Sequence, residues 1–154
     1  MQVSYTKQLT ARELAAWRGF LRVHAALVRD LDRELEEAHG LPLTQYEVLL
    51  YLETAPGHRL RMSDLAASVL LSQSGVTRLV DRLERAGHVV RKPCDVDRRV
   101  LYAEVTESGR ARLAEARPTH LAGVRARFLG HFDADELDEL AAAWERVRPG
   151  ITDE

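Results

Sequence analysis

Residues 72–87, "SQSGVTRLVDRLERAG", read as one short helix whose two sides differ in chemistry. Four apolar residues recur at the i, i+3, i+4 and i+7 positions that share a helix face, which predicts that they point into a core. They are Val76, Leu79, Val80 and Leu83. The other side begins with small hydrogen-bonding residues and becomes cationic further along. We expect Ser72 to cap this helix and Gly87 to end it.

A β-hairpin is predicted directly after this helix. Valines at 89 and 90, and the run "VLYAEV" at 100–105, favour strands, whereas Pro93, Asp95 and Asp97 favour a turn between them. The turn carries two adjacent arginines, Arg98 and Arg99. We expect Asp97 to orient a neighbouring arginine.

Helical patterns surround the hairpin on both sides. Capping signals predict helix starts at "TARE" (10–13), at "TQYE" (44–47), at Thr106 and at the pair Asp133 and Glu136. The first helix carries an apolar stripe from Trp17 to Leu35 and should end near Gly40, and a short helix is expected over 63–69. Pro118 should bend or restart the helix that Thr106 begins. The predicted order is four helices, a hairpin and two helices, which is a mainly α (α+β) fold.

The charge of the chain is unevenly distributed. The 154 residues suit a single domain, with 45% hydrophobic and 30% charged residues and a net charge of −2. Between residues 78 and 99, seven basic residues outnumber four acidic ones, whereas from 131 to 154 eight acidic residues outnumber two basic ones. The basic excess therefore lies beside the hairpin, although such a run also suits a plain solvated surface.

Several functional classes find no support in the sequence. No apolar run is long enough to span a membrane, and the first residues lack a signal-peptide pattern, so we expect no membrane partner and a cytoplasmic location. The six histidines and the single cysteine show no metal-ligand spacing, and a lone cysteine excludes an internal disulfide. No phosphate-binding loop, dinucleotide fingerprint or hydrolase motif occurs, so we expect neither an enzyme nor a cofactor.

The helix and the hairpin together predict a surface that binds double-stranded DNA. Short polar side chains at a helix N-terminus can reach base edges in the major groove, while arginine reads guanine or binds a phosphate. The residues assigned to this contact are Ser72, Gln73, Ser74, Thr77 and Arg78. The helix over 63–69 would brace them, as in a helix-turn-helix. The hairpin would then act as a wing, with Arg98, or Arg99 in its place, in the minor groove or on the backbone.

The stretches "LSQSGVTRLVDRLERAGHVVR" (71–91) and "DRRVLYAEVTESG" (97–109) resemble the winged helix-turn-helix of the MarR (multiple antibiotic resistance regulator) family. The order of the motifs, the spacing from helix to wing and the following "T-x-x-G" all match. The resemblance implies a homodimeric transcription factor, in which residues of about 1–40 and 110–154 form dimerisation helices around a DNA-binding lobe of about 43–108. It also implies, for many members, a small-molecule effector pocket between the dimer interface and that lobe.

The residues support a dimer independently, because the terminal helices carry more large apolar side chains than a short helix pair buries. We expect a repressor that leaves a pseudo-palindromic operator when a phenolic or aromatic effector binds, with no ligand residue assigned. His24, Trp17 and Arg22 are weak pocket candidates. An activator, a regulator without a ligand, a redox sensor acting through Cys94 and a protein-binding winged helix remain as alternatives.

Overall fold

The computed structural model describes residues 9–69 and 73–152. The described elements are, in chain order, α1 (Ala11–His39), α2 (Leu43–Thr54), η1 (Pro56–His58), β1 (Arg59–Arg61), α3 (Met62–Ser68), α4 (Gln73–Arg85), β2 (Val89–Pro93), β3 (Leu101–Val105), α5 (Glu107–Arg127), η2 (Leu129–His131) and α6 (Ala134–Val147). The mainly α fold with a small antiparallel sheet is confirmed.

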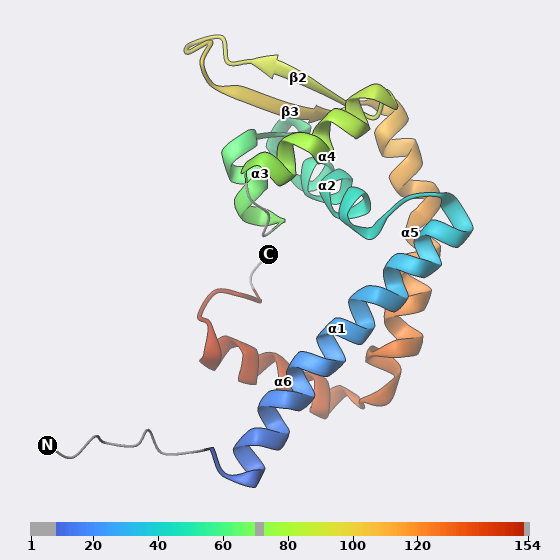
Figure 1. Cartoon of the computed structure of the whole chain (residues 1–154), viewed down its shortest axis with the longest axis vertical. Helices are drawn as coiled ribbons and strands as arrows, with labels where there is room; N and C mark the ends of the chain where they lie inside the picture. The colour runs from blue at the N-terminus through green and yellow to red at the C-terminus, as the bar shows by residue number, and fades with distance from the viewer. Residues whose placement is uncertain (1–8, 70–72, 153–154) are drawn as a thin grey trace, which may run out of the picture.

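The elements form two regions, which we call the lobe and the stem. The lobe comprises α2 to β3, and the stem comprises α1, α5 and α6. Figure 1 shows α1 and α5 running side by side away from the lobe, with α6 crossing near the far end of the stem. The β2–β3 hairpin projects from the opposite end of the molecule. Within the described residues, no helix combines the length and the hydrophobicity needed to cross a bilayer.

The first helix begins and ends where its sequence signals predicted. The Glu13 backbone N–H donates to Thr10 Oγ1 at 3.2 Å, and the Thr10 backbone N–H donates to Glu13 Oε2 at 2.7 Å, which is a complete capping box. Gly40 ends the helix in the left-handed conformation, with φ of 61°. A capping box at Asp133 and Glu136 likewise starts α6.

The predicted capping box at 44–47 is wrong. Helix α2 already begins at Leu43 after Pro42, so Thr44 lies inside the helix and cannot cap it. The Leu43 backbone N–H instead donates to Asp32 Oδ1 at 2.8 Å. The capping group therefore comes from α1, through a tertiary contact that no local pattern reveals.

The sheet has a strand that the sequence pattern did not predict. Its order is β1-β3-β2, and both strand pairs are antiparallel. The extra strand β1 is only three residues long, "RLR", and pairs Arg61 with Tyr102 of β3. The hairpin of β2 and β3 agrees with the prediction. The sheet therefore places β1 beside β3, the second strand of the wing.

Helix α5 connects the lobe to the stem without a break. Thr106 caps it as predicted, since its Oγ1 accepts from the Gly109 N–H at 3.1 Å. Of the two outcomes expected at Pro118, a bend or a restart, the restart does not occur, because the helix continues from Glu107 through Pro118 to Arg127. A proline inside a helix costs about 3 kcal/mol, and packing of α5 against α1 and α2 offsets that cost.

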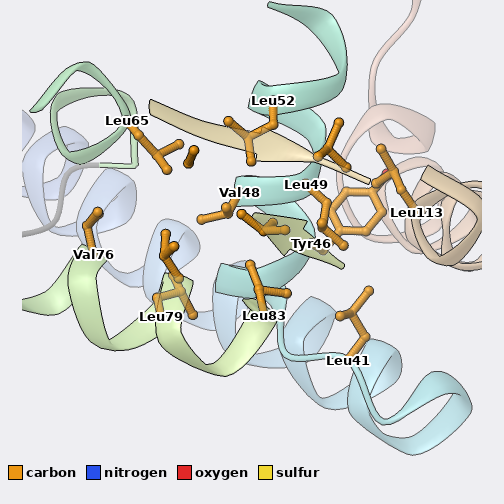
Figure 2. Packing of buried hydrophobic residues seen from close by; sticks show 14 of the residues in the cluster. Leu41, Tyr46, Val48, Leu49, Leu52, Leu65, Val76, Leu79, Leu83 and Leu113 are labelled. Atoms are coloured by element: carbon orange, nitrogen blue, oxygen red, sulfur yellow. The ribbon is translucent and has the colours of Figure 1, made fainter. Parts of the chain in front are cut away.

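Most of the hydrophobic core lies in the lobe, and Leu35 of α1 and Leu113 of α5 add to it from the stem. Figure 2 shows Val48 and Leu49 of α2 surrounded by side chains from α3, α4 and α5. The largest fully buried side chains are Tyr46, Leu35, Leu41, Leu49, Leu52, Leu65, Leu83, Leu113, Val48, Val76, Val80 and Val89. In contrast, the apolar stripe of α1 remains largely exposed: Leu35 is its only buried residue.

Close packing and ion pairs join the two long helices of the stem. A Cβ added at Gly123 of α5 would stand 2.8 Å from Leu31 Cδ2 and 2.5 Å from Glu34 Oε2, so the helices approach closely there. One turn further on, Arg127 Nε donates to Glu34 Oε1 at 2.8 Å and its Nη1 contacts Asp30 Oδ2 at 3.1 Å. These contacts hold α5, and with it the lobe, against α1.

Candidate nucleic-acid interface

Helix α4 has the two faces that its sequence predicted. Val76, Leu79, Val80 and Leu83 are each at most 6% exposed, which confirms the inward face. The outward face presents exposed side chains, namely Thr77, Arg78, Arg82 and Arg85. Of the other assigned contact residues, Ser72 lies outside the described residues, and so do the side chains of Gln73 and Ser74. Their base contacts stay predictions.

The turn between β2 and β3 is organised by Asp97. Its Oδ1 accepts from Arg99 Nε at 3.1 Å and from the Arg99 backbone N–H at 3.1 Å, and its Oδ2 accepts from Arg99 Nη2 at 3.1 Å. The Arg99 side chain, followed by its backbone N–H, lowers the pKa of the Asp97 carboxyl. Asp97 therefore neutralises and orients Arg99, the kind of pairing expected from the sequence.

The neighbouring arginine, Arg98, is not paired in this way. Arg98 is exposed and forms no hydrogen bond or ion pair with any residue of the described ranges. Its charge is therefore available to an external anion. Of the two wing arginines, Arg98 is the one whose charge the fold leaves uncompensated.

Arg91 of β2 links the wing to helix α4. Its guanidinium donates to Glu84 Oε2 at 2.7 Å and to Asp81 Oδ1 at 2.5 Å, and its backbone N–H donates to Glu84 Oε1 at 3.0 Å. These bonds from Arg91 lower the pKa of Glu84. Arg91, which was counted in the basic excess over 78–99, is therefore paired within the protein. Lys92 is likewise paired with Glu104 at 2.9 Å.

Helix α4 and the wing meet on one side of the lobe. Thr77 of α4 and Arg99 of the wing line the same hollow, together with residues of β1 and the start of α3. Figure 1 shows the hairpin projecting above α4. The polar helix face and the cationic wing therefore border one continuous surface.

The stem exposes a second surface, which is apolar. Trp17 is 53% exposed, Phe20 45% and Trp144 37%, and the Phe20 and Trp144 ring centroids are 5.4 Å apart. A hollow of about 470 Å³ opens among these helices. Its walls are Ala16, Gly19, Phe20, Val23, His24, Leu27, Phe128 and Trp144. Exposed apolar surface of this kind is typical of interaction sites.

Two further points from the sequence concern Cys94 and metal ligands. Cys94 lies in the wing turn, where the backbone N–H groups of Asp97 and Val96 lower the pKa of its thiol. Arg91 and Lys92, the basic residues that precede Cys94 in the sequence, are engaged with carboxylates. In the described part of the chain, no group of three or more potential ligand side chains could hold a metal ion.

Comparison with known proteins identifies relatives of this chain. A model of the MarR family matches residues 39–100. The regulator YkoM of Bacillus subtilis, an uncharacterized HTH-type transcriptional regulator, is 30% identical over 140 residues, which cover 91% of this chain and 88% of YkoM. The transcriptional repressor MprA of Escherichia coli is 30% identical over 107 residues, covering 70% of this chain and 60% of MprA.

A solved structure extends the likeness to the whole fold. The crystal structure of Sco3205, a MarR family transcriptional regulator from Streptomyces coelicolor, in complex with DNA, superimposes with a TM-score of 0.88 at 31% identity. The match covers 96% of this chain and 92% of Sco3205. The lobe and the stem therefore both have counterparts in that protein.

Proposed function

The chain belongs to the MarR family of transcriptional regulators, and from this membership we propose that two copies of it bind one pseudo-palindromic DNA operator. The observation that carries the proposal is the surface shared by α4 and the wing, where Thr77 and Arg99 line one hollow. A helix entering the major groove and a wing reaching the neighbouring minor groove need this arrangement.

The groups on this surface divide into two roles. Thr77 offers a hydroxyl near the start of α4, where base edges come within reach, together with the predicted contacts of Ser72, Gln73 and Ser74. Arg78 and Arg98 supply positive charge, with Arg98 in the minor groove or on the backbone. Because phosphate contacts release counterions, binding should weaken steeply as salt rises, despite the net charge of −2.

The exposed apolar surface of the stem supports the dimer. Large side chains of α1 and α6, including Trp17, Phe20 and Trp144, remain 37–53% exposed in a single chain. A second copy packed against the same surface would cover them through a two-fold symmetric interface. The α4 helices of the two lobes would then lie about 34–36 Å apart, which is one turn of DNA.

We propose further that the regulator is a repressor released by a small aromatic or phenolic effector. The hollow of about 470 Å³ in the stem falls in the size range of small-molecule sites, and its lining is apolar and aromatic with one histidine, His24. A ligand bound where the two copies meet would change the separation of the lobes, so that both α4 helices no longer fit consecutive major grooves.

Selection of bound duplexes from a random-sequence pool tests the proposal. We expect enrichment of an inverted repeat whose half-site centres are about 10–10.5 base pairs apart. Absence of any enriched sequence at low salt would contradict it. A panel of small phenols and aromatic acids, titrated against the selected complex, then tests the effector: no release by any of them favours a regulator without such a ligand.

A further inference from the structure

The hollow between α4 and the wing contains cationic groups beyond those predicted from the sequence. Its volume is about 390 Å³, and its walls include Arg61, Ser63, Thr77, Arg91, Arg99 and Leu101. Arg61 is the last residue of β1, immediately before α3. The short strand therefore brings a third guanidinium to the place where the recognition helix and the wing meet.

The three guanidiniums differ in whether their charge is already compensated. Arg91 is paired with Asp81 and Glu84, and Arg99 is paired with Asp97. Arg61 forms no ion pair with any residue that the structure describes, and the one hydrogen bond that its side chain makes to those residues runs from Nε to Tyr102 Oη at 3.3 Å. Because that bond uses a single N–H, the remaining N–H groups of Arg61 stay available. Arg61 is the cation of this hollow that is suited to an external anion.

The sheet positions Arg61 through Tyr102. The two residues are directly opposite in the β1–β3 register, so their side chains emerge on the same face. The guanidinium of Arg59 lies over the same tyrosine ring, 4.9 Å from its centroid. A ring in contact with two arginines from one strand limits the directions in which Arg61 can point. This ordering lowers the entropy that a contact by Arg61 would lose.

We propose that Arg61 binds a phosphate of the DNA backbone in this hollow, with Tyr102 as its positioning residue. The inference rests on the proposed function, since it requires α4 to enter the major groove. Thr77 also lines this hollow, so a duplex that meets α4 would bring a backbone strand past it. The Ser63 hydroxyl, at the start of α3, provides a second donor toward the same anion.

Arg61→Gln tests this contact by removing the charge and keeping a polar side chain. We expect affinity for the operator and for an unrelated duplex to fall alike, by about five-fold near 150 mM salt, because a phosphate contact carries no sequence information. The plot of log affinity against log salt should become shallower by about 0.9. Arg61→Lys should retain the parent slope. Tyr102→Phe should weaken binding to both duplexes while leaving thermal stability unchanged.

Arg110→Gln is the matched control. Arg110 is exposed at the start of α5 and lines a different hollow together with Glu53, Glu104 and Glu107, an acidic surrounding that disfavours phosphate. This variant should bind as the parent does. Inorganic phosphate at millimolar concentration should not compete with the duplex, because the duplex is held by α4 as well as by Arg61.

The outcomes separate this inference from the proposed function. If the parent binds duplexes and Arg61→Gln has the same salt slope as Arg110→Gln, the phosphate contact is wrong and the DNA-binding function stands. If Arg61→Gln changes the preference between operator and unrelated sequence, Arg61 reads bases and the phosphate assignment is also wrong. If the parent binds no duplex even at low salt, both the proposed DNA-binding function and the phosphate contact of Arg61 are wrong.

Discussion

Adjacent residues of the wing have different electrostatic environments. Arg99 is held by three hydrogen bonds to Asp97, whereas Arg98 has no partner in the described part of the chain. An arginine already paired with a carboxylate brings little net charge to DNA, because its field is compensated at short range. The order of importance proposed for the wing, Arg98 before Arg99, follows from this difference.

Replacement of Arg98 by alanine should therefore weaken binding to many sequences alike. The expected loss is about three- to ten-fold at moderate salt, with a salt slope shallower by about 0.9, as measured by fluorescence anisotropy over a salt series. Thr77→Val provides the contrast, since loss of a base-edge hydroxyl should change which sequences are preferred and leave the slope unchanged. Parent-like binding by both variants would show that the assigned surface is wrong.

The sequence predicted which residues are charged or apolar, but not which charged residues pair with one another. The periodicity of Val76, Leu79, Val80 and Leu83 was sufficient to predict their burial, because one helix face must pack. Nothing in the order of residues distinguishes Arg91, which is bound to Asp81 and Glu84, from a free cation. Such pairing depends on which helix and strand lie together, so it becomes visible only in three dimensions.

The junction of the wing and α5 is closely packed. A Cβ added at Gly109 would lie 2.1 Å from the backbone oxygen of His88 and 2.8 Å from Val105 Cγ2. That oxygen also accepts from the Thr106 N–H at 3.0 Å, so it cannot move away without breaking a bond. The glycine of the "T-x-x-G" motif is thus required by the contact between helix and hairpin.

Gly109→Ala should accordingly destabilise the fold by about 1–3 kcal/mol, the range for forcing extra volume into a packed site. Urea unfolding followed by circular dichroism measures this free energy. Gly19→Ala is the matched control, because a Cβ there meets nothing within 4 Å and alanine favours a helix. Equal stability of the two variants would rule out a tight junction at Gly109.

The packing of α2 against α5 should make stability depend on pH. His120 stacks on Tyr46 with ring centroids 4.5 Å apart, and its buried Nδ1 has no partner in the described residues. Burial lowers the pKa of His120 from its ordinary 6.5. The unfolded chain then takes up the proton first, so this contribution to stability is complete above pH 6.5 and decreases as pH falls below it.

Thermal unfolding at several pH values between about 7.5 and 5.5 should show this decrease. His120→Phe, which retains an aromatic ring against Tyr46, should reduce the pH dependence, whereas the same change at exposed His131 should leave it as in the parent. A pH profile unaffected by His120→Phe would show that another group, such as His88, whose pKa burial also lowers, accounts for the effect.

Some helix starts could be predicted from the sequence, whereas the start of α2 and strand β1 could not. Local signals located the starts of α1, α5 and α6 because each cap is made within four residues. The start of α2 was missed because its cap, Asp32, comes from another helix. Strand β1 was missed because three residues carry no period and exist as a strand only through pairing with β3.

At the scale of the whole molecule, apolar burial is incomplete. The core fills the lobe, while the stem leaves Trp17, Phe20 and Trp144 between 37% and 53% exposed. The large apolar side chains of the terminal helices already indicated this excess. A second copy of the chain would supply the missing surface, and its two-fold symmetry would also duplicate the DNA-binding surface.

Trp144→Glu should therefore weaken self-association by about ten-fold or more, since it places a charge in an apolar contact. Sedimentation equilibrium of the protein alone measures the change. Asp138→Asn, on the exposed side of α6, should associate as the parent does. A parent chain that sediments as a monomer at micromolar concentration would count against the dimer.

Sedimentation velocity of labelled DNA measures how many chains bind one selected duplex, and so tests directly whether two copies bind one operator. We expect two chains per duplex at about 50 mM salt, with the complex dissociating as salt rises to several hundred millimolar. A complex containing a single chain, or no complex at the lowest salt, would contradict it.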